Sequence, residues 1–495
     1  MPTARFDRAA WPFALALLIA AVTRLAAPFD GLFGQDAFAY FRFARAIAPH
    51  LLHGAPLPDL YWPRGYPAAV AALLPLAGGG PFAGQLVSAL AVAWAAAATY
   101  LLVRELDGMR GGADDPTARI VAGLSVAASG IALRTGQVVM ADGLGIGLAA
   151  TALWCLARYL RAGRGPWLVL AAVAVAFGAV TRWQVGLLAL PLGVATLLAR
   201  RARPAAGGRG WWVVAALAGL AVLVPQLLAA HAVPYALEQH DWLLRWSPAN
   251  ALGRDFDNRE AHFHYRFPVG LFCLWRLGWP DALFPTVAAL AVVGAWVLGR
   301  ERRAVALALL VGWPVVNTAF VCGIPYENPR FLWPALPALG ALIGIGYGFV
   351  RGRLPAGRRW GLALGLGASL AAGLVLGARE HGRTVARKNA DRAVVDWLDA
   401  TVPAGTTLLM PGGSMMAEHY GRTPVRDTYP LSPADLPPLL AQACPCFYLE
   451  DPGEIEGRMA GRPPQQVSQA LRRDPGLTAV ATRGPLILYR VGPPP

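Results

Sequence analysis

"RYLRAGRGPWLVLAAVAVAFGAVTRWQVGLLALPLGVATLLARRAR", residues 158–203, holds two apolar runs that are separated by a single arginine and flanked by clusters of arginines. The runs, 166–181 and 184–199, approach the ~20 residues that a helix needs to cross a bilayer. Short cytoplasmic loops of membrane proteins are enriched in arginine and lysine. The stretch therefore predicts a helical hairpin whose two ends face the cytoplasm and whose turn, at Arg182, faces outward.

The same alternation extends along the whole chain, which has 495 residues, of which 56% are hydrophobic and 15% charged. A soluble domain would be less apolar and more charged. We therefore predict a mainly α, polytopic transmembrane helical bundle with about eleven spans, its N-terminus in the cytoplasm and its C-terminus outside. The predicted spans are 11–28, 82–103, 119–134, 138–157, 166–181, 184–199, 211–230, 283–299, 304–321, 331–350 and 360–377.

The basic residues follow the ends of these spans. The formal net charge is +15, and Lys388 is the only lysine. Because the arginines punctuate apolar runs instead of forming one basic face, the pattern argues against a nucleic-acid partner. Arg5 and Arg8 precede the first run as in a signal peptide, but Arg24 interrupts its end and many spans follow, which favours an uncleaved first helix.

Three sizeable pieces are predicted to face outward: the loop 29–81, the loop 231–282 and the tail 378–495. In the tail, 446–451 and 486–491 resemble strands and 463–473 resembles a helix, which indicates a small α/β domain. We therefore expect two domains: a transmembrane domain over 1–377 that includes the two outward loops, and an extracytoplasmic α/β domain over 378–495.

Two acids are candidates for chemistry on the outward side. Asp36 begins an aromatic, arginine-bearing helix within "FGQDAFAYFRFARAI" (33–47), and it is either a helix cap or a reactive group. Asp142, in "GQVVMADGLGIG", falls near the outer end of the span 138–157. An acid at membrane depth costs on the order of 3 kcal/mol, so a functional role is favoured over a hydrated position. The glycines beside it are expected to allow close helix packing.

Three arginines are predicted to share this side of the membrane. Arg182 occupies the short turn "TRWQ", and Arg330 starts a span in "YENPRFLWPALP", three residues after Glu327. Arg64 lies among aromatic residues in "YWPRGYP", next to Tyr61. Each arginine alone is explained by interfacial anchoring. Together they place three guanidinium groups near two carboxylates.

In order and topology these motifs resemble the GT-C glycosyltransferases, polytopic enzymes akin to aminoarabinose transferases and protein O-mannosyltransferases. The resemblance rests on Asp36 before an amphipathic helix, on "YWPRGYPAAVAALLPL", on Asp142, on "TRWQVGLLALP", and on "NPRFLWPALPALGAL", which is similar to the family's Arg-Tyr-Leu-x-Pro-x-x-Pro helix. One departure is Ala37, because many relatives carry Glu directly after the first acid.

The resemblance implies an inverting glycosyltransferase of the bacterial inner membrane. Such an enzyme moves a hexosyl or pentosyl group from a polyprenyl-phosphate donor to a lipid, glycan or protein acceptor on the periplasmic side. Asp36 is then the general base. Arg182 and Arg330, with Arg64, bind the donor phosphate through forked hydrogen bonds. Asp142 orients an arginine, holds a metal or contacts the acceptor, and Tyr61 and Glu327 are candidate donor or acceptor contacts.

Other interpretations stay open at this point. A transporter or flippase, a non-catalytic scaffold, and a surface-glycan ligase or polymerase are the alternative functions. No cofactor is certain beyond a candidate divalent metal, for which His262 and His264 with Asp255 or Asp257 are weak ligands; a polar loop is the favoured explanation. Cys444 and Cys446 are equally compatible with a disulfide and with free thiols, and "GGSMMAEHYGR" (412–422) lacks the lysine of a phosphate-binding loop.

Overall fold

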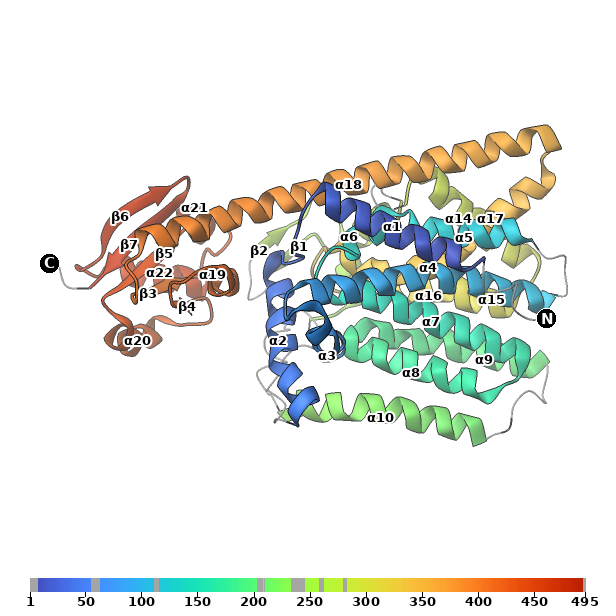
Figure 1. Cartoon of the computed structure of the whole chain (residues 1–495), viewed down its shortest axis with the longest axis horizontal. Coiled ribbons are helices and arrows are strands. Elements are labelled where there is room, and N and C mark those ends of the chain that lie inside the picture. The colour runs from blue at the N-terminus through green and yellow to red at the C-terminus, as the bar shows by residue number, and fades with distance from the viewer. Residues whose placement is uncertain are drawn as a thin grey trace.

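The computed structural model describes residues 8–54, 63–110, 115–202, 208, 210–232, 245–257, 262–278 and 283–492. The part before residue 356 is almost entirely helical (Figure 1). In this part, the helices on which the predicted spans fall are α1 (Ala10–Ala26), α4 (Phe82–Arg110), α5 (Pro116–Ala127), α6 (Gly130–Thr135), α7 (Ala141–Ala162), α8 (Gly165–Thr181), α9 (Ala189–Ala202), α10 (Gly210–Ala232), α14 (Pro285–Arg300), α15 (Ala304–Leu310), α16 (Gly312–Cys322) and α17 (Leu336–Arg353).

The chain is a multi-pass membrane protein. Among the described residues, seven helical segments are long and apolar enough to cross a membrane, and three shorter apolar helices accompany them. Every predicted span falls on helical segments, but two of them divide between separate α-helices. The span 119–134 divides into α5 and α6 at Ser129, whose hydroxyl accepts from the Ala132 amide at 3.0 Å, and 304–321 divides into α15 and α16 at Val311. The mainly helical fold is thus confirmed, while the count of eleven spans and their orientation stay predictions.

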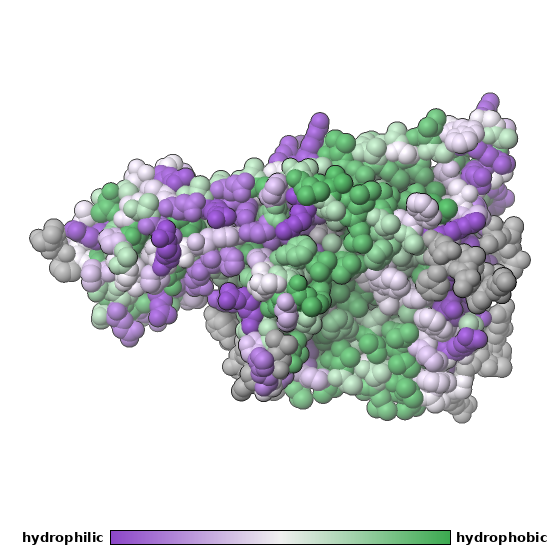
Figure 2. Space-filling model, in the orientation of Figure 1, coloured by the Kyte–Doolittle hydropathy of each residue, from purple (hydrophilic) through white to green (hydrophobic). Residues whose placement is uncertain are grey.

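The surface of the bundle is largely hydrophobic, as a lipid-facing surface requires. Figure 2 shows hydrophobic side chains over the helical body and mostly hydrophilic side chains over the C-terminal part. In α10 the exposed side chains include Val213, Leu217 and Leu228. These residues belong to a helix whose main packing partner is α8.

Glycines bring several helices into direct backbone contact. A Cβ on Gly143 or Gly147 of α7 would lie 3.0 or 2.8 Å from carbonyl oxygens of α4, as the sequence led us to expect. In the pair α14–α17 the approach is closer still: a Cβ on Gly294 would overlap the Leu342 carbonyl oxygen, and one on Gly346 would overlap that of Leu290. Small residues at helix interfaces permit this packing.

The segments that we predict to face outward gather at one end of the bundle (Figure 1). They comprise α2 (Gly34–His53), α3 (Gly65–Leu73), the antiparallel pair β1 (Asp255–Asp257) and β2 (His262–His264), and α13 (Val269–Leu277). At the opposite end of α4, Glu105 is fully buried and forms ion pairs with Arg104, Arg158 and Arg161.

The helix α18 (Ala356–Thr401) links the bundle to a C-terminal unit (Figure 1). Its first part is the predicted span 360–377, and the helix continues without a break past residue 378, where we placed the domain boundary. It has 46 residues, about 70 Å at 1.5 Å per residue, which is more than twice the thickness of a hydrocarbon core.

The C-terminal unit is a five-stranded mixed sheet in the order β4-β3-β5-β7-β6. Its strands are β3 (Thr407–Met410), β4 (Val425–Asp427), β5 (Cys446–Glu450), β6 (Thr478–Arg483) and β7 (Leu486–Val491), and its helices are α19 (Ser414–Tyr420), α20 (Leu436–Ala443), α21 (Pro452–Glu456) and α22 (Pro463–Arg472). The predicted strands and helix match β5, β7 and α22. Alternate residues of β3 and β5 pack against α18 and α19 on one face and against α20 and α22 on the other.

The C-terminal unit contacts the bundle directly beside α2. Lys388 of α18 forms an ion pair of 2.8 Å with Asp30, and the Tyr420 hydroxyl of α19 donates to the same carboxylate at 2.5 Å. Phe38 of α2 packs edge-on against the Tyr420 ring. The stretch 412–422, which contains α19, therefore forms a docking helix and its flanking turns.

The glycine contacts of α14 and α17 lead to a stability prediction. Replacing Gly346 by Ala places a methyl group against the Leu290 carbonyl oxygen, so the two helices must move apart, and we expect a loss of about 1–3 kcal/mol of stability. Thermal unfolding of the purified protein measures it. Gly361→Ala on α18 is the matched control, because no atom lies within 4 Å of the position that its methyl group would take. Equal stability of the two variants would contradict the prediction.

Candidate active site

Two helices begin at the outward end with an acid in their first turn. Asp36 is the third residue of α2, and Asp142 is the second residue of α7. A carboxylate in the first turn is stabilised by the partial positive charge of the helix N-terminus. The N-cap residue of α2 is Phe33, and no side-chain cap hydrogen bond is present. The cap interpretation of Asp36 is therefore wrong, and its carboxylate is directed to another partner.

Two arginines lie where the membrane helices are interrupted. Arg182 ends α8 with an extended backbone, before the 3-10 helix η3 (Trp183–Leu188). Arg330 is the second residue of a 3-10 helix, η5 (Pro329–Ala335), and its amide donates to the Asn328 side chain at 3.1 Å. The two interruptions are joined, since Gln184 donates to the Phe331 carbonyl oxygen at 2.6 Å.

These four residues form one cluster, which we call the acid–arginine cluster. The Arg330 guanidinium bridges both acids: its Nε donates to Asp142 Oδ2 at 3.0 Å, and its Nη2 donates to Asp36 Oδ2 at 3.1 Å. Arg182 forms an ion pair with the other oxygen of Asp142. The structure thus brings together four of the residues that the sequence proposed.

Burial divides the two acids. The Asp142 side chain is 1% exposed, and both of its oxygens face arginines. The Asp36 side chain is 31% exposed and is held through one oxygen only. The cluster has two negative and two positive groups, so its formal charge is zero. Asp142 is placed to fix the two arginines, whereas Asp36 is the acid that a ligand from outside reaches.

Arg64 lies close to the same corner of the molecule. Its amide donates to the Gln226 side chain of α10 at 3.0 Å. A Cβ on the next residue, Gly65, would meet the Thr181 hydroxyl at 2.5 Å, so the start of α3 packs against the residue before Arg182. Tyr61, the remaining candidate from this motif, lies outside the described residues.

Glu327 lies on the connection between α16 and η5, three residues before Arg330. Its Oε1 is buried and has no hydrogen-bond partner among the described residues. Burial raises the pKa of the Glu327 carboxyl to about 7. Its proton therefore exchanges near neutral pH, close to an arginine of the cluster.

Tyr40 is a residue of the site that the sequence reasoning missed. It follows Asp36 by one helical turn, its side chain is buried, and its ring packs edge-on against Tyr66 at 5.3 Å between centroids. Burial raises the pKa of the Tyr40 phenol, and the nearby charges of Asp36, Arg182 and Arg330 also act on it. The i, i+4 spacing from Asp36 is the sequence signal that would have identified Tyr40.

The histidines of the outward loop are engaged in pairs. His264 contacts Asp255 across the β1–β2 pair, and His262 lies 3.9 Å from Asp257. Asp257 also forms an ion pair with Arg462 of the C-terminal unit. Across the described ranges of the chain, no three His, Cys, Asp or Glu side chains gather in a way that would hold a metal ion.

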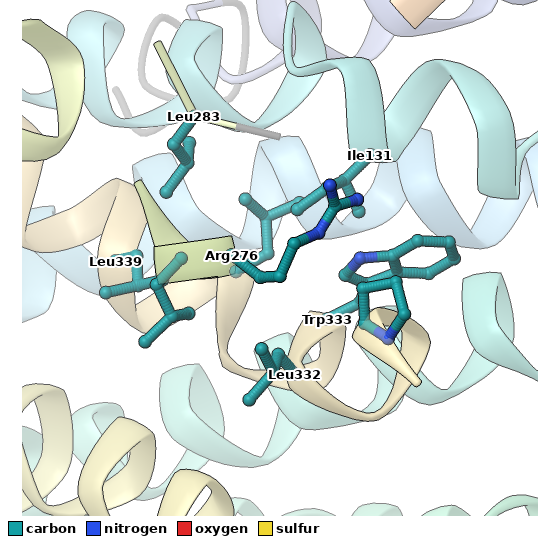
Figure 3. Close-up of a pocket in the computed structure, with 9 residues that line it drawn as sticks. Ile131, Arg276, Leu283, Leu332, Trp333 and Leu339 are labelled. Carbon is teal, nitrogen blue, oxygen red and sulfur yellow. The ribbon is translucent and has the colours of Figure 1, made fainter. Parts of the chain in front are cut away.

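Residues of η5 and α13 also line a small pocket (Figure 3). Its walls are apolar apart from Arg276 of α13, which extends between Ile131 and Trp333. Because η5 contributes Arg330 to the cluster and Trp333 to this pocket, one short 3-10 helix connects the two.

Comparison with known proteins identifies the fold that holds this cluster. Residues 63–228 match the family model of dolichyl-phosphate-mannose-protein mannosyltransferases, a segment that includes Arg64, Asp142 and Arg182. ArnT from Cupriavidus metallidurans, solved with undecaprenyl phosphate, superposes with a TM-score of 0.64 at 16% identity, over 98% of this chain and 99% of that one. The chain has the GT-C fold. The resemblance predicted from the motifs is confirmed.

Other GT-C structures are similar over most of this chain. The oligosaccharyltransferase of Archaeoglobus fulgidus in its apo form has a TM-score of 0.60 at 12% identity, over 95% of this chain and 73% of that chain. The same organism's AglB, in complex with an inhibitory peptide and a dolichol-phosphate, has a TM-score of 0.54 at 11% identity, over 94% and 72%. No curated protein sequence matches the chain.

The burial of Asp142 leads to a prediction about stability. Asp142→Asn leaves Arg182 and Arg330 with an uncompensated charge, so we expect a loss of about 3–5 kcal/mol. Asp36→Asn removes a partly exposed partner and should cost much less. Thermal or denaturant unfolding of both purified variants compares them. An Asp142→Asn variant as stable as Asp36→Asn would show that Asp142 does not balance the two arginines.

The buried carboxyl of Glu327 leads to a prediction about pH. Because its native pKa of about 7 exceeds the ordinary value of 4.5, the native state retains a proton that the unfolded state releases between these values. Stability should therefore fall as the pH rises through this window. We expect Glu327→Gln to raise the melting temperature more at pH 8 than at pH 5. An equal effect at both pH values would contradict this.

Proposed function

We propose that the protein is an inverting glycosyltransferase that moves a sugar from a polyprenyl-phosphate donor to an acceptor on the outer side of the bacterial inner membrane. The observation that supports this most is the acid–arginine cluster: a partly exposed carboxylate, Asp36, held by Arg330 beside a second arginine in a GT-C fold. Glycosyl transfer from a sugar phosphate requires a base for the acceptor hydroxyl and cations for the departing phosphate.

In the proposed reaction Asp36 takes the proton of the acceptor hydroxyl as the acceptor oxygen bonds to the anomeric carbon. The bond between that carbon and the phosphate oxygen breaks on the opposite face, which inverts the centre and releases polyprenyl phosphate. The Asp36 oxygen that is not held by Arg330 is the proton acceptor. Because the base is fixed at the start of α2, its position is set before the acceptor arrives.

Arg182 and Arg330 are proposed to bind the donor phosphate. A guanidinium has five N–H donors. Arg330 uses Nε and Nη2 to hold the two acids, which leaves further donors of the same fork for a phosphate oxygen. Asp142 is a positioning residue in this scheme, because it fixes both arginines through a carboxylate that solvent does not reach. Arg64 is proposed to add a third cation from the start of α3.

The lipid part of the donor suits a membrane-embedded site. The related ArnT structure holds undecaprenyl phosphate, and the related AglB structure holds a dolichol-phosphate and a peptide. For this chain we propose the same class of donor. The acceptor is a lipid, a glycan or a protein hydroxyl, and Glu327, with its orphaned Oε1, is proposed to contact it. The C-terminal unit lies against α2 through Phe38 and Tyr420, and we propose that it helps to hold the acceptor.

The donor set of the cluster does not favour a divalent metal. Both oxygens of Asp142 face arginines, and Asp36 is held by Arg330. The two guanidinium groups already supply the positive charge that a departing phosphate needs. We therefore assign no step of the proposed reaction to a metal.

The proposal is tested by Asp36→Asn in the purified protein, assayed for release of polyprenyl phosphate from lipid-linked sugars. We expect the rate to fall by about 10²–10⁴-fold, the usual contribution of a general base. A panel of donor sugars and of lipid, glycan and peptide acceptors identifies the substrates. Binding of the donor should persist, because Arg182 and Arg330 are unchanged.

Glu380→Gln is the matched control, since Glu380 is a partly exposed acid of α18 that pairs with Arg383 one turn along the same helix. Its turnover should equal that of the wild type. Full turnover by a folded Asp36→Asn variant would remove Asp36 as the base. Turnover by no combination of donor and acceptor in the wild-type protein would argue against the proposed activity itself.

A further inference from the structure

The five cysteines of the chain separate into two neighbouring pairs and one single residue. Cys444 and Cys446 are joined by a disulfide in the C-terminal unit. Cys273 of α13 and Cys322, the last residue of α16, are free but lie side by side, with a hydrogen bond between their thiols. Cys155 lies alone, fully buried among the helices of the bundle core.

Residues 245–253 are tied to the end of α16, and the Val269 amide at the start of α13, the helix of Cys273, donates to the Gly253 carbonyl oxygen at 3.0 Å. The Trp246 indole donates to the Phe320 carbonyl oxygen at 2.8 Å, and the Ser247 amide donates to that of Gly323 at 3.0 Å. Both thiols also belong to one apolar cluster with Val269, Val321 and Leu332. The two thiols therefore lie in one apolar cluster, close enough for a hydrogen bond between them, and such proximity is required before a disulfide forms.

We infer that Cys273 and Cys322 form a disulfide in the mature protein, which covalently ties the outward loop 245–278 to the end of α16. Their segments lie at the end of the bundle that contacts the C-terminal unit, since Asp257 of the same outward loop forms an ion pair with Arg462, and this unit holds the Cys444–Cys446 bond. If that end faces outward, as the arginine pattern predicts, both pairs experience the oxidising conditions in which disulfides form and persist. This inference depends on the orientation and not on the proposed glycosyl transfer.

The bond forms by thiol–disulfide exchange with a disulfide-bearing oxidant. The thiolate of Cys322, the more exposed of the two, attacks one sulfur of the oxidant and forms a mixed disulfide. The Cys273 thiolate then attacks the Cys322 sulfur of the mixed disulfide and displaces the oxidant's thiolate. The chain loses two thiol protons and two electrons, and the oxidant leaves as a dithiol that takes up both.

This bond would act on the segment that contains Arg330. Cys322 is followed directly by the connection that holds Glu327 and then by η5. A covalent tie at Cys322 limits how far that connection moves. The bond closes a loop of about 50 residues, and closing a long loop restricts the unfolded chain strongly.

The test is differential alkylation of the full-length wild-type protein. Fresh membranes are dissolved in denaturant with N-ethylmaleimide, then reduced and treated with an isotopically heavy maleimide, and the peptides are assigned by mass spectrometry. We expect light label only on Cys155, the internal reference for a free thiol, and heavy label on the other four cysteines. Because labelling takes place in denaturant, burial does not protect a free thiol.

Cys273→Ser provides the matched change, since it should transfer Cys322 from heavy to light label and leave Cys444 and Cys446 heavy. A reducing agent should also lower the melting temperature of the wild type more than that of the Cys273→Ser/Cys322→Ser variant. Light label on Cys273 and Cys322 at the level of Cys155 in the wild type overturns the inference. If Cys444 and Cys446 are light as well, the predicted orientation fails with it.

Discussion

The candidate site depends on the compensation of one buried charge. Asp142 has 1% of its side chain exposed, and an ionised carboxylate in such a place is tolerated only when opposite charges surround it. Two arginines supply that charge, and each must reach Asp142 from another part of the chain. Both stand where regular helix gives way to 3-10 helix, at η3 and η5. The two arginines that pair with Asp142 thus both come from places where a membrane helix is interrupted.

The same pairing decides where Asp36 lies. Arg330 is held to Asp142 through Nε, so the rest of its guanidinium plane is fixed, and Asp36 meets Nη2 of that plane. Arg330 is 188 positions from Asp142 and 294 positions from Asp36 in the chain, so no local secondary-structure preference would bring them together. A buried acid therefore orders an arginine, and the arginine orders the exposed acid that we propose as the base.

The sequence predicted the helical fold and the composition of this cluster for one physical reason. Apolar runs of sufficient length and arginines at their ends specify which side of the membrane each turn occupies, so Asp142, Arg182 and Arg330 were expected on a common face. Because few other charged groups share that face, Asp142, Arg182 and Arg330 were expected to contact one another. The role of Asp36 was left between cap and reactive group, because an acid in a first turn fits both; only the position of Phe33 at the N-cap and the contact with Arg330 separate them.

Other features depend on information that hydropathy does not contain. The fall in hydropathy after residue 377 marks the end of an apolar surface and not of a helix, since α18 continues through the more polar residues up to Thr401. Tyr40 was missed because a tyrosine among aromatic residues at helical spacing is usually explained by packing. Tyr61 and the neighbouring residues lie outside the described part of the chain.

The C-terminal unit also helps to fix the position of α2. Asp30 accepts hydrogen bonds from Lys388 and Tyr420 and from the Leu32 amide, so a single carboxylate joins α18, α19 and the turn that leads into α2. These interactions lower the pKa of Asp30 against the effect of its burial, which keeps the carboxylate ionised and the junction intact. Because Asp36 follows that turn by a few residues, the position of the proposed base depends on a contact with the C-terminal unit. Ala37 stands where many GT-C relatives have a second acid, so Asp36 is a lone carboxylate. Arg330 holds Asp36 from one side and the Asp30 junction holds its helix from the other. In the proposed reaction this rigid placement gives Asp36 the orientation that a base needs.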